Sequence, residues 1–523
     1  MKMSTSMTRT SLRLALAALP VFVTACSVGP DYTTPSAPLP AAATYKEVDP
    51  KHIGKWKPAE PQDHIARGKW WEIYHDATLN RLEEQVNISN QNVAQAEAQF
   101  RSAAATVKVA RADFFPTITA NPAFTESQAS ENLSRGNMSG STSSISNSSQ
   151  GSGAQVTQLY TLPLEATYLV DIWGSVRRSV ESQSATAQAS FANLENVRLT
   201  YQAALAQDYF NLRGLDAQAQ LLQKTVTSYE QFLQLTQNRY NSGVASQADV
   251  AQAKTQLDTT KAQLIDVGVQ RAIYEHAIAT LIGKPATDFG LGKNPLEGTP
   301  PHIPAGMPSE LLERWPDVAQ AERQVAAANA QIGVQVAGYF PQLTISAQTG
   351  LESVRLADLF SGPSFLWSVG PVIAQTVFDA GRTHGLVQEA QANYDGTVAN
   401  YRQVVLTSIQ QVEDSLSGLR ILENEAVAED EAVKSALQSL DVSTNQYKAG
   451  TADYLTVITT QAIALNDQIT AVNIRTRRMT TSVQLIAALG GGWDKSKLAS
   501  TNGVADVPQA QAEISREKKS ATP

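Results

Sequence analysis

The chain has 523 residues, with 41 Lys and Arg against 49 Asp and Glu, for a formal net charge of −8. It has no long basic run, so the electrostatic footprint of a nucleic-acid-binding protein is missing and we expect no nucleic-acid partner. Only 17% of residues are charged and 7% are aromatic. This composition suits closely packed helices with a wet, uncharged face.

Cysteine and histidine usage argues against catalysis. The single cysteine excludes an intrachain disulfide and any metal site made from several thiolates. The six histidines are scattered without ligand spacing, and no nucleophile motif accompanies them. We therefore expect no enzyme activity, no metal and no cofactor apart from a covalent lipid.

The first 25 residues have the layout of a secretory signal. Lys2, Arg9 and Arg13 precede an apolar run from Leu14 to Val23. That run is too short to span a bilayer, which needs about 20 apolar residues, and no later stretch supplies 18 without polar interruption. The sequence predicts export, with any membrane contact made by strands or lipid.

Cys26 lies directly after this apolar run, in a string that resembles the lipobox of bacterial lipoproteins. The resemblance implies cleavage before Cys26 and acylation of its thiol. Ser27 follows where aspartate would signal retention, which implies delivery to the outer membrane. The alternative is a small buried apolar residue.

The chain contains a tandem repeat. The turn sequence around Gly243 matches the one around Gly450, 207 positions later, and Gly174 matches Gly381 at the same offset. The first copy also holds 18 extra residues, which we place in the serine-rich stretch from Ser127 to Gly153, predicted to be an exposed loop.

In chain order, each copy is predicted to contain a helix, a strand pair, a very long helix and a further helix. The first long helix, of about 66 residues, would span ~100 Å. No compact domain contains such a helix, so the helices should pack as a long coiled wall. The predicted helices are Leu79–Ala112, Ser175–Tyr240, Ser246–Ile282, Ser309–Ala337, Arg382–Tyr447 and Ala452–Leu489.

The strands show period-two alternation. Between Tyr160 and Ile172 the apolar residues share one face, and the same pattern occurs between Leu343 and Leu351. On this pattern alone, an ordinary sheet over a soluble core is about as good an interpretation as a membrane barrel. Four strands cannot close a barrel, so a barrel would require several copies of the chain.

At this point the chain resembles the TolC-like outer membrane factor family, in its lipoprotein branch serving resistance-nodulation-division pumps. The resemblance runs from Cys26 to about Trp493. It rests on CSVGPDY from Cys26, Trp70-Trp71, PSELLERWPDVAQAE from Pro308, GYFPQLTI from Gly338 and the glycine turns at Gly243 and Gly450.

The resemblance implies a mainly helical fold with a small β part. It also implies a homotrimer with a twelve-stranded outer-membrane barrel and a twelve-helix periplasmic tunnel. The expected partners are a periplasmic adaptor, an inner-membrane transporter and outer-membrane lipid. The expected function is passive exit of drugs or other small solutes through the outer membrane.

By the same resemblance, the two glycine turns form a periplasmic tip that closes the pore. Asn241-Ser242-Gly243 can end a helix, and Ser246 with Asp249 forms a capping box for the next. Asp249 has either this capping role or a gating role. Ala452 stands where relatives carry a latch arginine. The candidate tip residues are Tyr240, Asn241, Gly243, Ser246, Asp249, Tyr447, Gly450, Thr451 and Asp453.

Thr456 and Thr459 occupy the positions of aspartate rings that favour cations in relatives. Asp249 and Asp453 are then the remaining candidates for a negative constriction. Tyr240 and Tyr447 are interpreted as packing residues at the helix ends, with a hydrogen bond from Tyr447 across the closed tip as a minor alternative.

The sequence leaves two other functions open. One is an envelope lipoprotein that tethers through coiled coils, and the other is a duct for protein secretion. The predicted division is a signal at 1–25, a lipidated extended segment at 26–78, a first repeat at 79–290, a Pro-rich link at 291–308, a second repeat at 309–495 and a disordered tail at 496–523.

Overall fold

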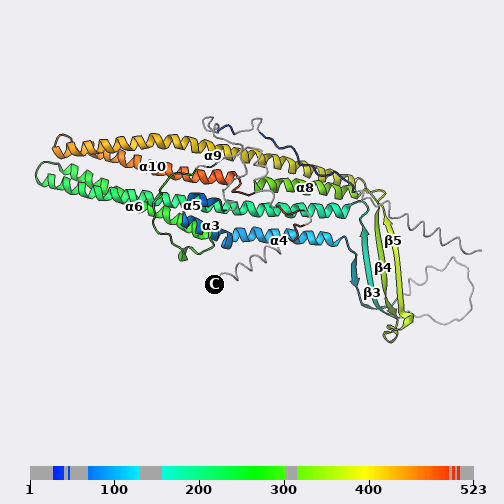
Figure 1. Ribbon diagram of the computed structural model, residues 1–523. Helices are drawn as coiled ribbons and strands as arrows, with labels where there is room; N and C mark the ends of the chain where they lie inside the picture. Colours follow the sequence, from blue (N-terminus) through cyan, green and yellow to red (C-terminus); the bar gives the residue numbers. More distant parts are fainter. Residues whose placement is uncertain are drawn as a thin grey trace, which may run out of the picture. The chain divides into compact units, whose positions relative to one another are not determined.

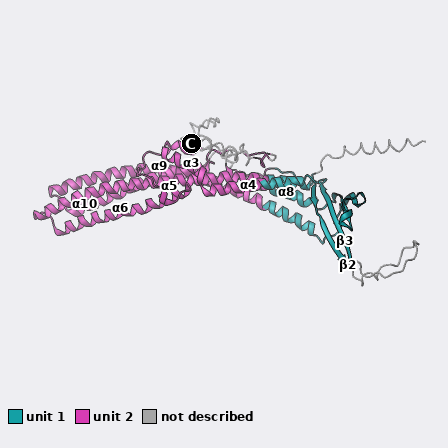
Figure 2. Cartoon of the chain, turned by 90° about the horizontal axis from the view of Figure 1, so that it is seen from below, with its two compact units in different colours: residues 1–33, 105–184, 326–395 teal, residues 34–104, 185–325, 396–523 magenta. Residues whose placement is uncertain are grey.

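The computed structural model describes residues 27–39, 45–47, 69–128, 156–301, 303, 315–493, 498–500 and 503–506. The chain splits into two compact units, coloured separately in Figure 2. The first unit comprises Met1–Thr33, Ala105–Ser184 and Ala326–Asp395. The second comprises Thr34–Ala104, Ala185–Val325 and Gly396–Pro523. Each unit therefore combines parts of both sequence repeats.

The first unit contains an antiparallel sheet. β3 (Val156–Val170), β4 (Gln342–Ser353) and β5 (Phe365–Ala374) pair in that order, and Figure 1 shows them side by side. β1 (Thr117–Ala120) and β2 (Ala123–Gln128) both pair with β3, so they occupy one strand position. The four predicted positions are present, but the first strand is interrupted, and the sequence at that point is Asn121-Pro122. Proline cannot donate to a ladder, which accounts for the break.

The register places apolar side chains in rows on one face of the sheet. Ala166 pairs with Ile118 on one side and Ala347 on the other, and Ala347 pairs with Val369. Because strand residues alternate between faces, the intervening threonines, serines and glutamines share the opposite face. In the single chain Ala166 and Ala347 are half-buried, whereas apolar residues of the outer strands are exposed, Trp367 by 69%. This face has the one-sided pattern predicted from the sequence.

A carboxylate fixes the passage from strand to helix in the first unit. Asp171 follows β3 and accepts hydrogen bonds from the backbone N–H groups of Val176 (3.0 Å) and Arg177 (3.0 Å). The Arg177 guanidinium also donates to this carboxylate at 3.1 Å. The acid thereby caps the start of α5 (Ser175–Asn241), because free N–H groups at a helix start need acceptors.

The remaining helices agree with the prediction at most ends. They are α3 (Ala77–Ser89), α4 (Gln91–Ala112), α6 (Gln247–Leu281), α8 (Pro316–Ala337), α9 (Arg382–Ala449) and α10 (Tyr454–Ala488). Residues 304–314 lie outside the described part, so α8 is described from Pro316 rather than from the predicted Ser309. Across the described ranges, no helix is both long enough and apolar enough to cross a membrane.

The predicted helix Leu79–Ala112 is wrong in one respect, because it breaks at Asn90. The Asn90 backbone is extended, and its side-chain oxygen accepts hydrogen bonds from the N–H groups of Asn92 (2.9 Å) and Val93 (3.1 Å). Its side-chain amide donates to the carbonyl oxygen of Leu281 at 2.8 Å. Asn90 therefore caps α4 and at the same time binds the end of α6.

A buried ion network holds the segment after α6 in the second unit. The fully buried carboxylate of Asp216 accepts from Arg271 (2.7 Å), Arg213 (3.1 Å) and the backbone N–H of Asn294 (2.9 Å). Arg271 also donates to the carbonyl of Leu291 at 2.6 Å. The beginning of the link between the repeats is thus fixed to α5 and α6.

Two loop predictions need correction. Ser127 belongs to β2, so the predicted serine-rich loop begins later, and residues 129–155 lie outside the described part. The tail predicted as disordered from 496 contains Val504 and Ala505, which are buried, and the carbonyl of Ala499 accepts a hydrogen bond from Gln188 at 2.7 Å. Apolar burial of this short stretch accounts for its order.

Candidate functional site: two helical turns in the second unit

The first turn joins α5 to α6 and requires glycine for backbone reasons. Gly243 has φ of +73°, in the left-handed region that side-chain-bearing residues avoid. A Cβ there would meet nothing within 4 Å, so the requirement is conformational and not steric. The predicted capping box is present: Asp249 accepts from the N–H of Ser246 at 2.9 Å, and Ser246 accepts from the N–H of Asp249 at 3.2 Å.

The second turn joins α9 to α10. It repeats the glycine, but a single N-cap residue replaces the capping box of the first turn. Gly450 has φ of +78°. Asp453 caps α10 by accepting from the N–H of Thr456 at 3.0 Å and from its hydroxyl at 2.6 Å. Hydrogen bonds from Thr456 lower the pKa of Asp453, and the one from the hydroxyl has a larger effect than the one from the backbone N–H. Thr451 does not cap this helix, because its N–H and hydroxyl both donate back to the carbonyl of Gln446.

An aromatic cluster lies behind the turns. Tyr447 is 3% exposed, and its ring lies 5.9 Å from Phe232 and 5.6 Å from Tyr454. The Tyr447 hydroxyl has no hydrogen-bond partner among the described residues of this chain. Burial raises the pKa of Tyr454, and the nearby phenols and Asp249 raise it further by smaller amounts. The packing interpretation therefore fits Tyr447, whereas Tyr240, at 39% exposed, does not fit it.

Arg239 connects the two turns and was missed in the sequence. Its guanidinium lies over the Tyr447 ring, 4.6 Å from the centroid, and donates to the carbonyl of Lys448 at 3.2 Å. A Cβ on Gly450 would lie 3.9 Å from the Arg239 Nη2 atom. The one available signal was a basic residue in the last turn of α5, which also has a simpler explanation in the helix dipole.

The two acids near the turns, Asp249 and Asp453, both accept hydrogen bonds at the start of a helix. Carboxylates at helix N-termini commonly do so. Thr459, one of the two threonines for which the family resemblance implies an acid, donates its hydroxyl to the carbonyl of Leu455 at 2.8 Å. No group of His, Cys, Asp and Glu in the part of the chain that the structure describes has an arrangement suited to a metal ion.

The segment after Cys26 is held against the first unit, although Cys26 itself lies outside the described residues. Val28 donates its N–H to the carbonyl of Trp173 at 3.0 Å, three residues beyond the end of β3. The Arg178 guanidinium donates to Asp31 at 2.7 Å, and Asn329 donates to the carbonyl of Pro30 at 3.0 Å. Residues 28–31 are thus fixed close to the end of the sheet.

Two glycines allow this close approach. Gly29 has φ of +95°, and a Cβ on it would lie 2.4 Å from the Cα atom of Gly333. Gly174 has φ of +81°, and a Cβ on it would lie 3.0 Å from the Cα atom of Ser27. Contacts under 3.4 Å to backbone cannot be relieved by a rotamer change, so a side chain at either position would displace the segment.

Comparison with known proteins gives a consistent result. A model of the family described as outer membrane efflux protein matches residues 82–284 and 307–491. The pyoverdine export outer membrane protein OpmQ of Pseudomonas aeruginosa is 30% identical over 430 residues, covering 82% of this chain and 88% of OpmQ. The probable efflux pump outer membrane protein TtgC of Pseudomonas putida is 28% identical over 496 residues, covering 93% and 96%.

Solved structures agree with these relatives. The outer-membrane channel OprN superimposes with a TM-score of 0.78 at 27% identity, covering 90% of this chain and 100% of OprN. The outer membrane protein VceC of Vibrio cholerae gives a TM-score of 0.72 at 26% identity, covering 81% of this chain and 98% of VceC.

Proposed function

The chain belongs to the outer membrane efflux protein family and is an outer-membrane channel subunit for efflux, with its helical part in the periplasm; from this premise we propose that three copies together form the exit duct of a tripartite pump. An inner-membrane transporter supplies the energy in this scheme, and a periplasmic adaptor joins the two membranes. The duct itself conducts passively and catalyses nothing.

The two unpaired edges of the sheet are the observation that best supports a trimer. One edge is formed by β1 and β2 and the other by β5, so within the described residues both edges lack a neighbouring strand. Unpaired edges cannot face lipid, because each free N–H and C=O costs several kcal/mol there. Pairing β5 of one copy with β1 and β2 of the next closes the sheet. Three copies give twelve strand positions, with the apolar face toward lipid and the polar face toward water.

Lipid on Cys26 supplies the second membrane contact in this proposal. The contacts of residues 28–31 near the end of β3 support it, because they hold the start of the mature chain close to the segment that enters the membrane. Acyl chains contribute ~0.8 kcal/mol per buried methylene, so several chains or a chain plus the sheet anchor stably. Replacement of Cys26 by Ser should leave the sheet as the only anchor.

The two glycine turns form the periplasmic tip in this proposal, and Arg239 is the residue that holds them together in the closed state. The family resemblance implies an arginine beyond the second glycine, where this chain has Ala452. Arg239 reaches the same region from the other turn, through the Tyr447 ring and the Lys448 carbonyl. Binding of the adaptor would separate the turns and open the pore.

The solutes are drugs or other small molecules. The names of similar proteins mention pyoverdine, toluene and antibiotics. This range supports a duct with broad acceptance, and the cognate pump selects the solute.

Single-channel conductance in a planar bilayer tests the proposal. We expect discrete steps that depend on salt, together with a trimer mass by native mass spectrometry. Asp453→Asn retains the cap of α10, since Asn is also a good N-cap, and Asp249→Asn leaves Ser246 as the N-cap of α6. Together the two substitutions remove the negative charge. We expect this double variant to lose cation preference, measured as a reversal potential shifted toward zero in asymmetric salt.

Asp288→Asn, which removes one carboxylate per copy, is the control for loss of charge away from the turns, because Asp288 is exposed beyond the far end of α6. An unchanged reversal potential in the double variant would remove both acids from the constriction. A monomer that stays silent, even after the tip variant Arg239→Ala, would favour the coiled-coil tether over a channel. Conductance that required a bound protein substrate would favour the secretion duct.

A further inference from the structure

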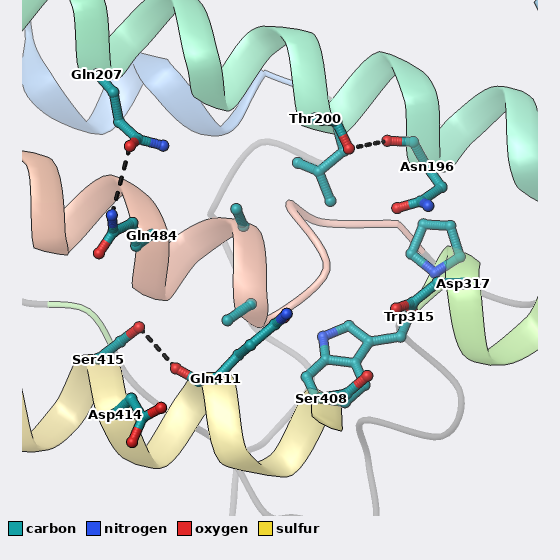
Figure 3. A pocket seen from close by; sticks show the side chains of 14 residues that line it. Asn196, Thr200, Gln207, Trp315, Asp317, Ser408, Gln411, Asp414, Ser415 and Gln484 are labelled. Atoms are coloured by element: carbon teal, nitrogen blue, oxygen red, sulfur yellow. Dashed lines mark hydrogen bonds between the residues drawn. The ribbon is translucent and has the colours of Figure 1, made fainter. Parts of the chain in front are cut away.

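A cavity of about 490 Å³ lies in the second unit, away from the turns (Figure 3). Its lining comes from α5, the start of α8, α9 and the end of α10. This volume lies within the range of about 300–1,000 Å³ that small-molecule sites occupy. Half of the lining side chains are polar and uncharged, including Asn196, Thr200, Gln411 and Gln484.

Trp315 provides the first sign that the cavity receives a ligand. Its side chain is 3% exposed, yet its indole N–H has no hydrogen-bond partner among the described residues. In Figure 3 the indole extends into the space between the helices, with its nitrogen toward that space. A buried N–H without an acceptor costs about 1–3 kcal/mol, so an occupant that carries an acceptor oxygen would be stabilised there.

The charge of the lining provides the second sign. Asp317 and Asp414 are the ionisable residues among those lining the cavity, and no Lys, Arg or His joins them. The Asp317 carboxylate accepts a hydrogen bond from the N–H of Val318 at 2.8 Å. Burial raises its pKa, while that N–H, the backbone N–H of Asp317 itself and the Ser408 hydroxyl oppose the rise. A carboxylate in this setting gains from a neighbouring cation.

We infer that this cavity binds a small organic cation that also carries an oxygen acceptor. The ammonium group lies near Asp317, and the acceptor oxygen receives the indole N–H of Trp315. The amide side chains of Asn196 and Gln411 can bond further polar groups. None of the lining residues belongs to the two turns, and the site goes beyond the proposed function.

Acetylcholine is a suitable probe, because it combines a quaternary ammonium with an ester carbonyl. Two related probes isolate the features: 3,3-dimethylbutyl acetate is its uncharged carbon isostere, and tetramethylammonium lacks the acceptor. Binding to the purified full-length chain is measured by saturation-transfer difference NMR, with empty detergent micelles as the blank. We expect saturable acetylcholine binding with a dissociation constant on the order of a millimolar, and weaker binding of both other probes.

Variants then assign the contacts. Asp317→Asn should weaken acetylcholine and tetramethylammonium about two- to thirtyfold and leave the neutral ester unchanged. Trp315→Phe keeps the ring but removes the N–H, so it should weaken acetylcholine and leave tetramethylammonium unchanged. Asp430→Asn is the matched control, because Asp430 is an exposed carboxylate on α9 outside the lining.

Three results would overturn the inference: no saturable binding of acetylcholine, equal binding of the uncharged isostere, or an affinity that neither variant changes. The probe comparison uses the unaltered protein, so it decides the question even if Asp317→Asn does not fold. Circular dichroism and gel filtration check the fold of each variant.

Discussion

Arg239→Ala should release the two turns of the tip from each other. The side chain makes one cation–π contact, at 4.6 Å, and one hydrogen bond to a carbonyl, at 3.2 Å. At a partly exposed position the first contributes about 0.5–1 kcal/mol and the second about the same after solvent screening. The loss is then about 1–2 kcal/mol per copy, which corresponds to a roughly five- to thirtyfold shift toward the open state.

Closed-state dwell times in single-channel recordings measure this shift. Lys448→Ala is the matched control, because the contact uses the Lys448 carbonyl and leaves its exposed side chain free of that role. Arg239→Lys should give an intermediate result, since an ammonium keeps the charge but loses the planar stacking. Equal dwell times for Arg239→Ala and Lys448→Ala would refute the role of Arg239 in closure.

Three further outcomes follow from packing and charge. Gly29→Ala should raise the rate of proteolytic cleavage within residues 27–39 at least about tenfold, because the positive φ and the backbone contact each oppose a side chain. Gly298→Ala is the control, because Gly298 also has a positive φ, +87°, but a Cβ there meets nothing within 4 Å. Equal cleavage rates in the two variants would contradict the role of the backbone contact. Burial raises the pKa of Asp208 from its ordinary value of 3.8 to about 6, so the folded state binds the proton more tightly and stability falls as the pH rises through this window. Asp208→Asn should remove this dependence of stability on pH and raise the free energy of unfolding at pH 7 by about 1 kcal/mol after allowance for partial exposure, as measured by urea titration. An unaltered pH profile of stability would exclude Asp208 as the cause of the dependence. Asp216→Ala should lower the free energy of unfolding by about 3–5 kcal/mol, because the buried Arg213 loses its acid, whereas the partly buried Arg271 keeps its ion pair with Glu275. A loss below about 1 kcal/mol would mean that solvent reaches the network.

The sequence predicted those parts of the fold that depend on local pattern. Alternation identified β3 and β4, and the helical period identified α5 and α9 over nearly their whole lengths. The break at Asn90 was not predicted, because asparagine is only mildly unfavourable inside a helix. The contact that decides it is with the carbonyl of Leu281, which is distant in sequence.

The candidate site was predicted less completely. Glycines, Ser246 and Asp249 could be placed because caps and turns are local. Tyr240 and Tyr447 occupy equivalent repeat positions, so sequence treated them alike, yet only Tyr447 has Phe232 and Tyr454 against its ring. Arg239 was missed because its partners lie about 208 positions away in the chain.

The pairing of β3 with β4 also constrains the order of folding. Val170 lies opposite Leu343, so the centre of the sheet joins segments separated by more than 170 residues. During export the first repeat emerges well before its partner strand exists, and neither compact unit can be completed from it alone. Such long-range pairing is slow and leaves apolar strands open to aggregation in the interval. Biogenesis therefore depends on the periplasm protecting a half-emerged chain until the second repeat arrives.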